Sequence, residues 1–278
     1  MNTQQSEQIK QAVRERYGAI AVGSLSNSSC CGEETPQKSK KASPCCPTKD
    51  VADPVLNYTT AIGYSKEEIS AVPAESNMAL GCGNPTAIAN LKEGEVVLDL
   101  GSGGGFDCFL ASQQVGEKGF VIGVDMTPEM VAKARINALK GNFTNVEFRL
   151  GEIEYIPAAN SSVDAIISNC VINLSTDKPQ VFREALRVLK PGGRLAISDV
   201  VLTAKLPDEI LNDLSLYCSC TSGAISIEEY QTTLANAGFK DISIIPKEDS
   251  REFIREWREG MKLDDYLLSA IIEARKPL

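Results

Sequence analysis

A cysteine placed where a predicted strand runs out into a loop is the residue of this sequence with the most distinctive chemistry. Cys170 lies in SNCVINLS, directly after the apolar run 165–167, and Asn169 and Asn173 flank it. Parallel sheets bind ligands beyond the carboxyl ends of their strands, so we expect Cys170 to face a ligand and the asparagines to fix the loop or the ligand there. The competing interpretation is that a buried cysteine is only a small hydrophobe.

Further cysteines favour the ligand interpretation. Cys82 lies between two glycines in ALGCGNP, and Cys218 and Cys220 lie in YCSCTSGA. The chain has nine cysteines and no histidine, and none of these three is in a C-x-x-C pair, so a tetrahedral zinc site is not indicated. Thiolates without histidine suit a soft, thiophilic centre. Arsenic(III), which takes three sulfur ligands and keeps a lone pair, is such a centre.

A glycine-rich loop is the second chemical feature. VVLDLGSGGGFD places Asp99, Gly101, Ser102 and Gly103 at the end of a predicted strand. Glycine there allows a tight turn and the close approach of a ligand to the backbone, although turns alone explain many glycine runs. The G-x-G-G-G spacing departs from the nicotinamide fingerprint.

Two acidic residues follow this loop at informative places. Asp125 ends the next strand, about 20 residues further on, where a carboxylate can accept hydrogen bonds from ribose hydroxyls. Glu152 lies in GEIE after the third strand, where adenine edges are commonly bound. With the glycine loop, these residues predict a nucleotide-like ligand.

Strands and helices must alternate to position these residues. Apolar, β-branched runs predict strands at 95–100, 120–125, 146–151, 163–169 and 194–201. Amphipathic stretches predict helices between them at 106–115, 127–140 and 177–190, with Thr127 as N-cap of the second and PGG ending the third. This alternation predicts an α/β fold with a parallel sheet and right-handed crossovers.

The two ends of the chain follow other patterns. A helix is expected at 4–18, ending at Gly18, followed by an irregular stretch at 22–54 that holds the pairs Cys30-Cys31 and Cys45-Cys46. After residue 202 the pattern loosens, with a helix at 226–239 and late strands at 240–247 and 267–277. We therefore expect three regions, 1–75, 76–201 and 202–278.

Bulk composition excludes several classes of protein. The formal charge of −9 argues against binding to a nucleic-acid backbone. No stretch approaches the roughly 20 apolar residues of a membrane span, and the polar start gives no sign of a secretory leader. An odd number of cysteines without a leader is typical of reduced thiols in the cytoplasm.

These motifs together resemble a known family. The D-x-G-x-G pattern around Asp99 resembles that of Rossmann-like, class I S-adenosylmethionine-dependent methyltransferases, of which PGGRLAISD is also typical. GCGNP, DLGSGGGFDCFLASQQVG, VIGVDMTPEM, EFRLGEIEYIP, SNCVINLS and CTSGA are similar to arsenite methyltransferases of the archaeal and bacterial type. The likeness runs from about residue 75 onward, and also includes the early helix and the Cys-bearing N-terminal segment. It implies a C-terminal substrate-binding extension that completes the sheet.

The resemblance implies a role for each candidate residue. Arsenic(III) would be bound by Cys82, Cys170 and Cys220, with Cys30 or Cys31 as a further ligand and the choice between those two open. The methyl donor S-adenosylmethionine would be bound by Asp99, Gly101, Ser102, Gly103, Asp125, Met126, Glu152 and Asn169. Met126 has the alternative role of ordinary packing, Cys108 is assigned to the core, and Cys218, Cys45 and Cys46 have no assigned role.

The same resemblance implies the reaction and its partners. Arsenite and methylarsenite would be methylated, releasing S-adenosylhomocysteine, and a thiol reductant such as glutathione or thioredoxin would reopen a disulfide between Cys82 and Cys170. Two alternatives remain. A methyltransferase acting on quinone- or sterol-like molecules shares the donor site but leaves Cys170 and Cys220 unexplained. A non-catalytic metalloid-binding protein leaves the glycine loop unexplained.

Overall fold

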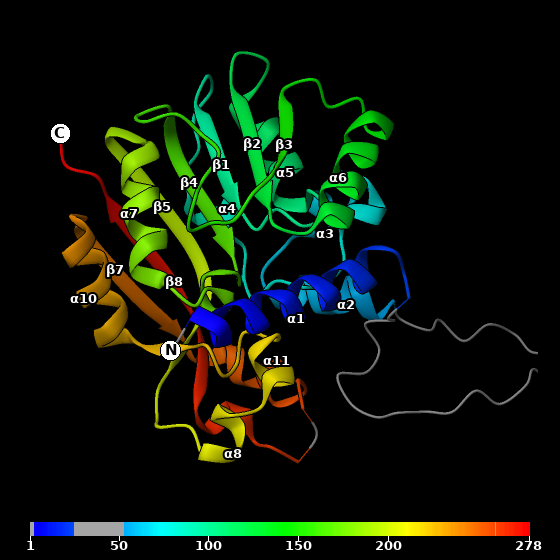
Figure 1. Ribbon diagram of the computed structural model, residues 1–278. Helices are drawn as coiled ribbons and strands as arrows, with labels where there is room; N and C mark the ends of the chain where they lie inside the picture. Colours follow the sequence, from blue (N-terminus) through cyan, green and yellow to red (C-terminus); the bar gives the residue numbers. More distant parts are fainter. Residues whose placement is uncertain (1–2, 25–52, 259) are drawn as a thin grey trace, which may run out of the picture.

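The computed structural model describes residues 3–24, 53–258 and 260–278. Within them, one eight-stranded sheet has the order β3-β2-β1-β4-β5-β8-β7, and β6 pairs with β5 (Figure 1). The strands are β1 (Val96–Leu100), β2 (Phe120–Asp125), β3 (Val146–Leu150), β4 (Val163–Asn169), β5 (Leu189–Leu202), β6 (Ile225–Ser226), β7 (Lys240–Lys247) and β8 (Leu267–Arg275). The pairs Cys30-Cys31 and Cys45-Cys46 lie outside the described residues.

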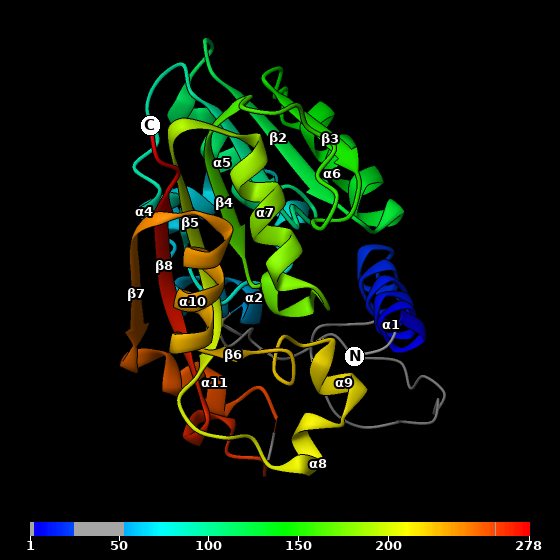
Figure 2. The same ribbon diagram turned by 60° about the vertical axis from the view of Figure 1, so that its left-hand side comes forward.

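Helices cover both faces of the sheet. They are α1 (Thr3–Ala21), α2 (Pro54–Ala61), α3 (Lys66–Ser70), α4 (Pro85–Ile88), α5 (Phe106–Val115), α6 (Pro128–Lys140), α7 (Lys178–Val188), α8 (Asp208–Leu211), α9 (Leu214–Tyr217), α10 (Ile227–Ala237) and α11 (Arg251–Arg255). Short 3₁₀ turns are η1 (Ala74–Ser76), η2 (Ile172–Leu174), η3 (Glu248–Ser250) and η4 (Leu263–Asp265). Figure 2 shows α7 and α10 on one face and α4 and α5 on the other.

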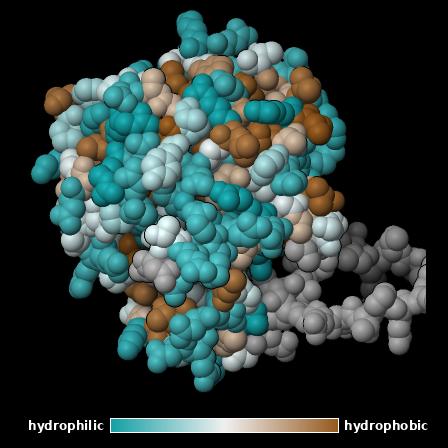
Figure 3. All heavy atoms as spheres, viewed as in Figure 1, coloured by the Kyte–Doolittle hydropathy of each residue, from teal (hydrophilic) through white to brown (hydrophobic). Residues whose placement is uncertain are grey.

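The hydrophobic core is divided by the sheet because successive strand residues point to opposite faces. Leu98 packs with Phe182 of α7 and Tyr230 of α10. Its neighbour Val97 packs on the other side with Phe109 of α5. These side chains are almost completely buried. The surface is largely polar, with hydrophobic side chains only in small groups on the face in Figure 3.

The candidate site lies at one edge of the parallel part of the sheet. β1 pairs in parallel with β2 and β4, and β4 pairs in parallel with β5, so their carboxyl ends meet at one edge. α1 lies across this edge, far in sequence from the strands it covers (Figure 1). None of the described helices is long and apolar enough to cross a membrane.

The structure also departs from the predicted elements. The late strands are antiparallel, since β8 pairs with β5 from Leu202↔Leu267 to Arg194↔Arg275 and β7 pairs antiparallel with β8. α1 continues past Gly18 to Ala21, so the predicted end of that helix is wrong. A Cβ on Gly18 would come within 3.1 Å of Glu129 Oε2, which shows that glycine here allows close approach to α6.

Thr127 is the N-cap of α6, as predicted, although its side chain makes no capping hydrogen bond and its backbone N–H donates to Asp125 Oδ1. The predicted end of the next long helix was wrong. α7 ends at Val188, before PGG, and residues 189–202 already form β5.

Candidate active site

The glycine loop after β1 forms one wall of a pocket at the carboxyl edge of the sheet. Gly101 and Gly103 have φ of +74° and +50°, a region that favours glycine. The Gly103 N–H donates to Asp125 Oδ2 at 3.0 Å, and the Thr127 N–H donates to Asp125 Oδ1 at 2.8 Å. Asp125 therefore ties the loop after β1 to the end of β2.

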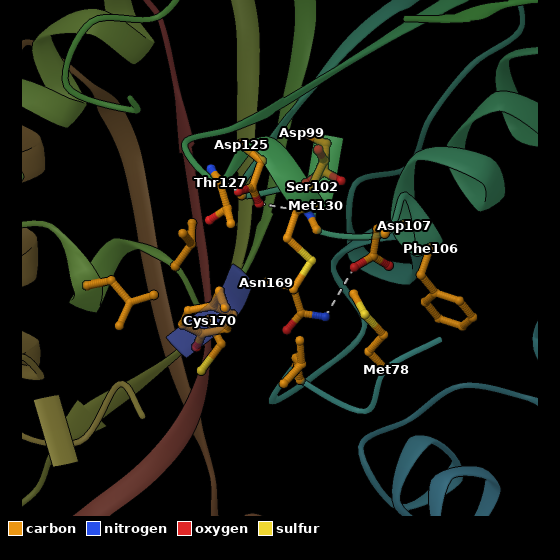
Figure 4. A pocket seen from close by; sticks show the side chains of 18 of the residues that line it. Met78, Asp99, Ser102, Phe106, Asp107, Asp125, Thr127, Met130, Asn169 and Cys170 are labelled. Atoms are coloured by element: carbon orange, nitrogen blue, oxygen red, sulfur yellow. Dashed lines mark hydrogen bonds between the residues drawn. The ribbon is translucent and has the colours of Figure 1, made fainter. Parts of the chain in front are cut away.

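Most of the predicted donor-binding residues line this pocket, here called the donor pocket. Asn169 lies centrally in the view of Figure 4, with Asp107, Phe106 and Met78 to one side and Cys170 to the other. The predicted donor-binding residues among its lining are Asp99, Gly101, Ser102, Gly103, Asp125, Met126 and Asn169. Glu152 is not among them.

Glu152 has a different structural role. Its carboxylate pairs with Lys10 at 2.6 Å and with Arg14, both on α1. Lys10, Val13 and Tyr17 of the same helix line the donor pocket. Glu152 thus holds the helix that covers the pocket.

The donor pocket has the polar groups that a cationic nucleoside ligand requires. Ser102 Oγ is buried and has no hydrogen-bond partner among the described residues. Asp99 and Asp107 are buried in the wall. Burial raises the pKa of Asp107 to about 6, against hydrogen bonds from Tyr64 and Asn169 that lower it. An unpartnered hydroxyl and two buried carboxyl groups fit a ligand that carries hydroxyls and positive charge.

The predicted arsenic ligands come together beside this pocket; we call Cys82, Cys170 and Cys220 the thiol cluster. The sulfurs of Cys82 and Cys170 and a carboxylate oxygen of Asp199 lie within 4.8 Å of one another. The Cys220 thiol donates to the Cys170 carbonyl at 2.7 Å. All three cysteines are buried and reduced. Segments far apart in sequence thus supply three adjacent thiols.

Backbone strain marks two of these cysteines. Cys170 and Cys220 have φ of +60° and +63°, in the left-handed region that side-chain-bearing residues rarely occupy. Each such residue costs about 1–3 kcal/mol and is maintained by its surroundings. The Cys170 N–H donates to Ser198 of β5 and the Cys220 N–H to Tyr217 of α9. The strained conformation directs both cysteines into one cluster.

The thiols are protonated when no substrate is bound. Burial raises the pKa of Cys82, and the hydrogen bond with Cys170 followed by burial raises the pKa of Cys220 well above its usual range. At Cys170 the hydrogen bond from Cys220 favours the thiolate, but the bond with Cys82 and burial outweigh it and raise the pKa. The carboxyl group of Asp199 adds to all three shifts.

The two flanking asparagines position the cluster. Asn169 Oδ1 accepts the Cys82 N–H at 2.9 Å, and its Nδ2 donates to the Gly83 carbonyl at 2.7 Å. Asn173 Nδ2 donates to Asp199 Oδ1 at 2.9 Å and to the Val200 carbonyl at 2.7 Å. Asn169 therefore holds the Cys82 loop against β4, and Asn173 holds Asp199.

A second cavity also reaches the thiol cluster. Cys170 lines both this cavity and the donor pocket, whereas Cys220 lines only the second cavity. Tyr58, Phe253 and Trp257 are also in its lining. Of the three cysteines, Cys170 thus lies where both cavities meet the thiol cluster.

Sequence reasoning missed several residues of the site. Asp199 is a carboxylate inside the buried run LAISDVV, which was a usable signal because such residues are rarely buried without a role. Asp107 and Tyr64 meet only through the fold; Tyr64 lies in no marked motif, and Asp107 ends VVLDLGSGGGFD without having been assigned a role. Cys108 is core as predicted, with its thiol donating to Asp99 Oδ2 at 3.1 Å.

The chain is similar in sequence to known methyltransferases. A sequence profile for a methyltransferase domain matches residues 91–238. The chain is 48% identical to an arsenite methyltransferase of Halobacterium salinarum over 271 residues, which are 98% of this chain and 67% of the relative. The chain belongs to the arsenite methyltransferase family. An arsenite methyltransferase of Aquipseudomonas alcaligenes is 42% identical over 200 residues, 69% of this chain and 57% of that relative.

Solved structures agree with this membership. An arsenic(III) S-adenosylmethionine methyltransferase from Chlamydomonas reinhardtii has a TM-score of 0.60 at 31% identity, covering 82% of this chain and 75% of that one. A Haemonchus contortus phosphoethanolamine N-methyltransferase 2 has a TM-score of 0.61 at 20% identity, covering 81% of this chain and 57% of that one, and shares the fold. The predicted family and Rossmann-like fold are confirmed.

Proposed function

We propose that this member of the arsenite methyltransferase family transfers methyl groups from S-adenosylmethionine to trivalent arsenic held by Cys82, Cys170 and Cys220. The observation that carries this proposal is the position of Cys170, which lines the donor pocket and also belongs to the thiol cluster. Arsenic bound there lies next to the donor. Arsenite and methylarsenite are the substrates, and the product is methylated arsenic.

Binding of arsenite exchanges oxygen ligands for sulfur. Three As–O bonds break and three As–S bonds form, and each thiol proton leaves with a hydroxide as water. The raised pKa values of the thiols are compatible with this exchange, because no free thiolate has to form beforehand. The arsenic lone pair stays available, so no base has to remove a proton from arsenic. This accounts for an active site without histidine.

The residues of the donor pocket bind and orient. S-adenosylmethionine supplies, when bound, an electrophilic methyl group on a sulfonium. Asp125 accepts hydrogen bonds from the ribose hydroxyls, Ser102 offers its hydroxyl, and the carboxyl groups of Asp99 and Asp107 balance positive charge. α1 excludes water from one side through Val13 and Tyr17. Catalysis is then mainly positioning and electrostatics in a buried site.

Each methylation leaves arsenic formally pentavalent, and two electrons must return before the next cycle. Cys82 and Cys170 have neighbouring sulfurs. Closing a disulfide between them supplies the two electrons, and a thiol reductant such as glutathione or thioredoxin then reopens it. We also place the protein in the cytoplasm, since its buried cysteines need a reducing compartment. Residues 202–278 act as the arsenic-binding region, because they contribute Cys220.

The test is arsenite-dependent consumption of the methyl donor, with the products separated by mass. Wild-type protein should release one S-adenosylhomocysteine for each methyl group that appears on arsenic. Cys170→Ser should form neither product. Arsenite binding without donor consumption would indicate a sequestration protein. Donor consumption with a quinone- or sterol-like acceptor but not with arsenite would indicate a methyltransferase acting on carbon or oxygen.

A further inference from the structure

The amide of Asn169 lies between the donor pocket and the Cys82 loop and bonds to both. Its Nδ2 donates to the Gly83 carbonyl at 2.7 Å, to the Tyr64 hydroxyl at 3.0 Å and to Asp107 Oδ2 at 3.2 Å. An amide nitrogen carries two hydrogens, so three acceptors share two donors. Any change in one of these bonds must therefore alter the others.

Two of the acceptors belong to the donor pocket. Tyr64 and Asp107 both line it, and Figure 4 shows the Asp107 carboxylate turned toward the Asn169 amide. The Tyr64 hydroxyl donates to Asp107 Oδ1 at 2.5 Å. Asp107 is buried near the carboxyl group of Asp99, and burial and the neighbouring Asp107 raise the pKa of Asp99 well above its usual range. A cationic donor would favour the ionised form of both groups. A donor ammonium group that pairs with Asp107 would compete with Asn169 for the carboxylate.

The third acceptor belongs to the arsenic side. Gly81 and Gly83 flank Cys82, and a Cβ on Gly81 would come within 2.5 Å of Asn169 Nδ2, so the loop and the amide are in tight contact. On the far side the Ser269 hydroxyl donates to the Cys82 carbonyl at 2.7 Å. The Cys82 loop is thus clamped between Asn169 and Ser269, and a stronger bond from Asn169 fixes the thiol more firmly.

We propose that the hydrogen-bonded residues Tyr64, Asp107 and Asn169 couple the two substrates. The methyl donor in its pocket tightens the Cys82 loop and so raises the affinity for arsenite. The donor ammonium group pairs with the Asp107 carboxylate and displaces the amide of Asn169 from it. The amide then bonds more strongly to the Gly83 carbonyl, and the Cys82 sulfur is held toward Cys170. Asn169 and Tyr64 are positioning residues in this scheme. The inference rests on the proposed function, because it assigns the donor and arsenite to these two sites.

The sole tryptophan of the sequence provides a direct measurement. Trp257 lines the second cavity together with Cys170 and Cys220. Its fluorescence can report arsenite binding, with and without saturating S-adenosylhomocysteine, which retains the ammonium group. We expect arsenite to bind the wild type at least about fivefold more tightly with S-adenosylhomocysteine. Calorimetry should give the same factor for the effect of arsenite on S-adenosylhomocysteine affinity, since coupling is reciprocal.

The decisive variant is Tyr64→Phe. It keeps the ring and its edge contact with Phe106 but removes the hydroxyl shared by Asp107 and Asn169. The coupling factor should fall to below about twofold. Because the factor is a ratio within one variant, a uniform loss of affinity cancels. Tyr266→Phe, whose hydroxyl lies outside this chain of bonds, should keep the wild-type factor.

Two results overturn the coupling. One is a wild-type factor of one, and the other is an unchanged factor in Tyr64→Phe. Either leaves the proposed function intact, because methylation of arsenite is measured separately. Failure of the function itself would be distinct, since the wild type would then bind arsenite or S-adenosylhomocysteine without producing methylated arsenic.

Discussion

At the scale of single residues, the three thiols of the cluster are not equivalent. Cys170 and Cys220 are held in strained left-handed conformations, and the Cys220 thiol donates a hydrogen bond to the Cys170 carbonyl. Cys82 comes from a separate loop that Asn169 and Ser269 secure. Arsenite can use three sulfur ligands, whereas methylarsenite already has carbon at one position and needs two. Under the proposed function, Cys82 is therefore expected to be the third ligand of arsenite.

Cys82→Ser should therefore nearly abolish methylation of arsenite but keep substantial methylation of methylarsenite. Cys170→Ser and Cys220→Ser should abolish both reactions. The measurement is product formation from each substrate, with excess reductant so that reduction is not limiting. Equal losses on both substrates for Cys82→Ser would contradict this scheme and would indicate an obligatory disulfide in every cycle.

Asp125 should carry a measurable part of donor binding. Its carboxylate faces the donor pocket and also holds the Gly103 and Thr127 N–H groups. Asp125→Ala should weaken S-adenosylhomocysteine binding by about 1–3 kcal/mol, the range for a hydrogen bond to a charged group. Calorimetry measures the loss, and Glu147→Ala, at a half-exposed carboxylate on β3 paired with Arg149, is the control. An unchanged affinity for Asp125→Ala would refute the assignment.

Motifs predicted the residues whose role depends on local sequence. The position of the loop at 101–103 and of Asp125 in the pocket wall could be predicted because glycine conformation and strand-end position are encoded within a few residues. Asp107 and Tyr64 could not, because 43 residues separate them and only the packing of α5 against the preceding segment brings them together. Glu152 was predicted to bind the donor because it follows β3, but in the structure its carboxylate forms ion pairs with α1.

At the scale of elements, periodicity predicted the strands β1 to β5 and the helices between them. Those segments are apolar runs or amphipathic helices of ordinary length, for which pattern is informative. The antiparallel direction of β7 and β8 was not predictable in this way, because pairing direction depends on where the chain returns to the sheet. The extension of α1 beyond Gly18 depends likewise on its contact with α6.

α1 should act as a cover that slows release of the donor. Lys10 and Arg14 anchor it to Glu152, and their partly buried pairs should contribute about 0.5–1 kcal/mol in total at low salt. Glu152→Gln should speed S-adenosylhomocysteine release two- to fivefold, about the rate change that this energy gives. The difference should shrink at high salt.

Stopped-flow fluorescence measures this release. Glu93→Gln breaks an exposed pair with Lys118, neither of which lines the donor pocket, and serves as the control. Equal release rates for wild type and Glu152→Gln at low salt would exclude a holding role for these ion pairs.

At the scale of the whole molecule, the site places carboxyl groups in the protein interior. Asp99 and Asp199 are almost fully buried, and Asp107 nearly so. Burial raises the pKa of Asp199 to about 6, although the Val200 and Asn173 N–H groups and the charge of Lys178 oppose the rise. A carboxyl group with a raised pKa in the folded state lowers the free energy of unfolding at any pH at which the same group is ionised in the unfolded chain.

The sign of this effect defines a pH window. Below about pH 4 Asp199 is protonated in both states, so its contribution to stability is fully present. As pH rises from about 4 to about 6 the unfolded chain loses this proton first, and the free energy of unfolding falls by up to about 3 kcal/mol. Above pH 6 the group is ionised in both states and the loss is complete.

Asp199→Asn should remove this dependence. The asparagine Oδ1 can still accept from the Val200 N–H and the Asn173 amide, which bond to Asp199 Oδ1 at 2.8 and 2.9 Å. The variant should therefore be about 1–3 kcal/mol more stable than the wild type at pH 7, with a smaller difference at pH 4.5. Urea unfolding at several pH values tests this, with the exposed substitution Asp208→Asn as control. If Asp199→Asn and wild type lose stability in parallel between pH 4.5 and 7, the buried carboxyl group is not the source of the loss. A gain in stability with slower methylation would show that the protein keeps Asp199 beside its thiols for the reaction, at the expense of the fold.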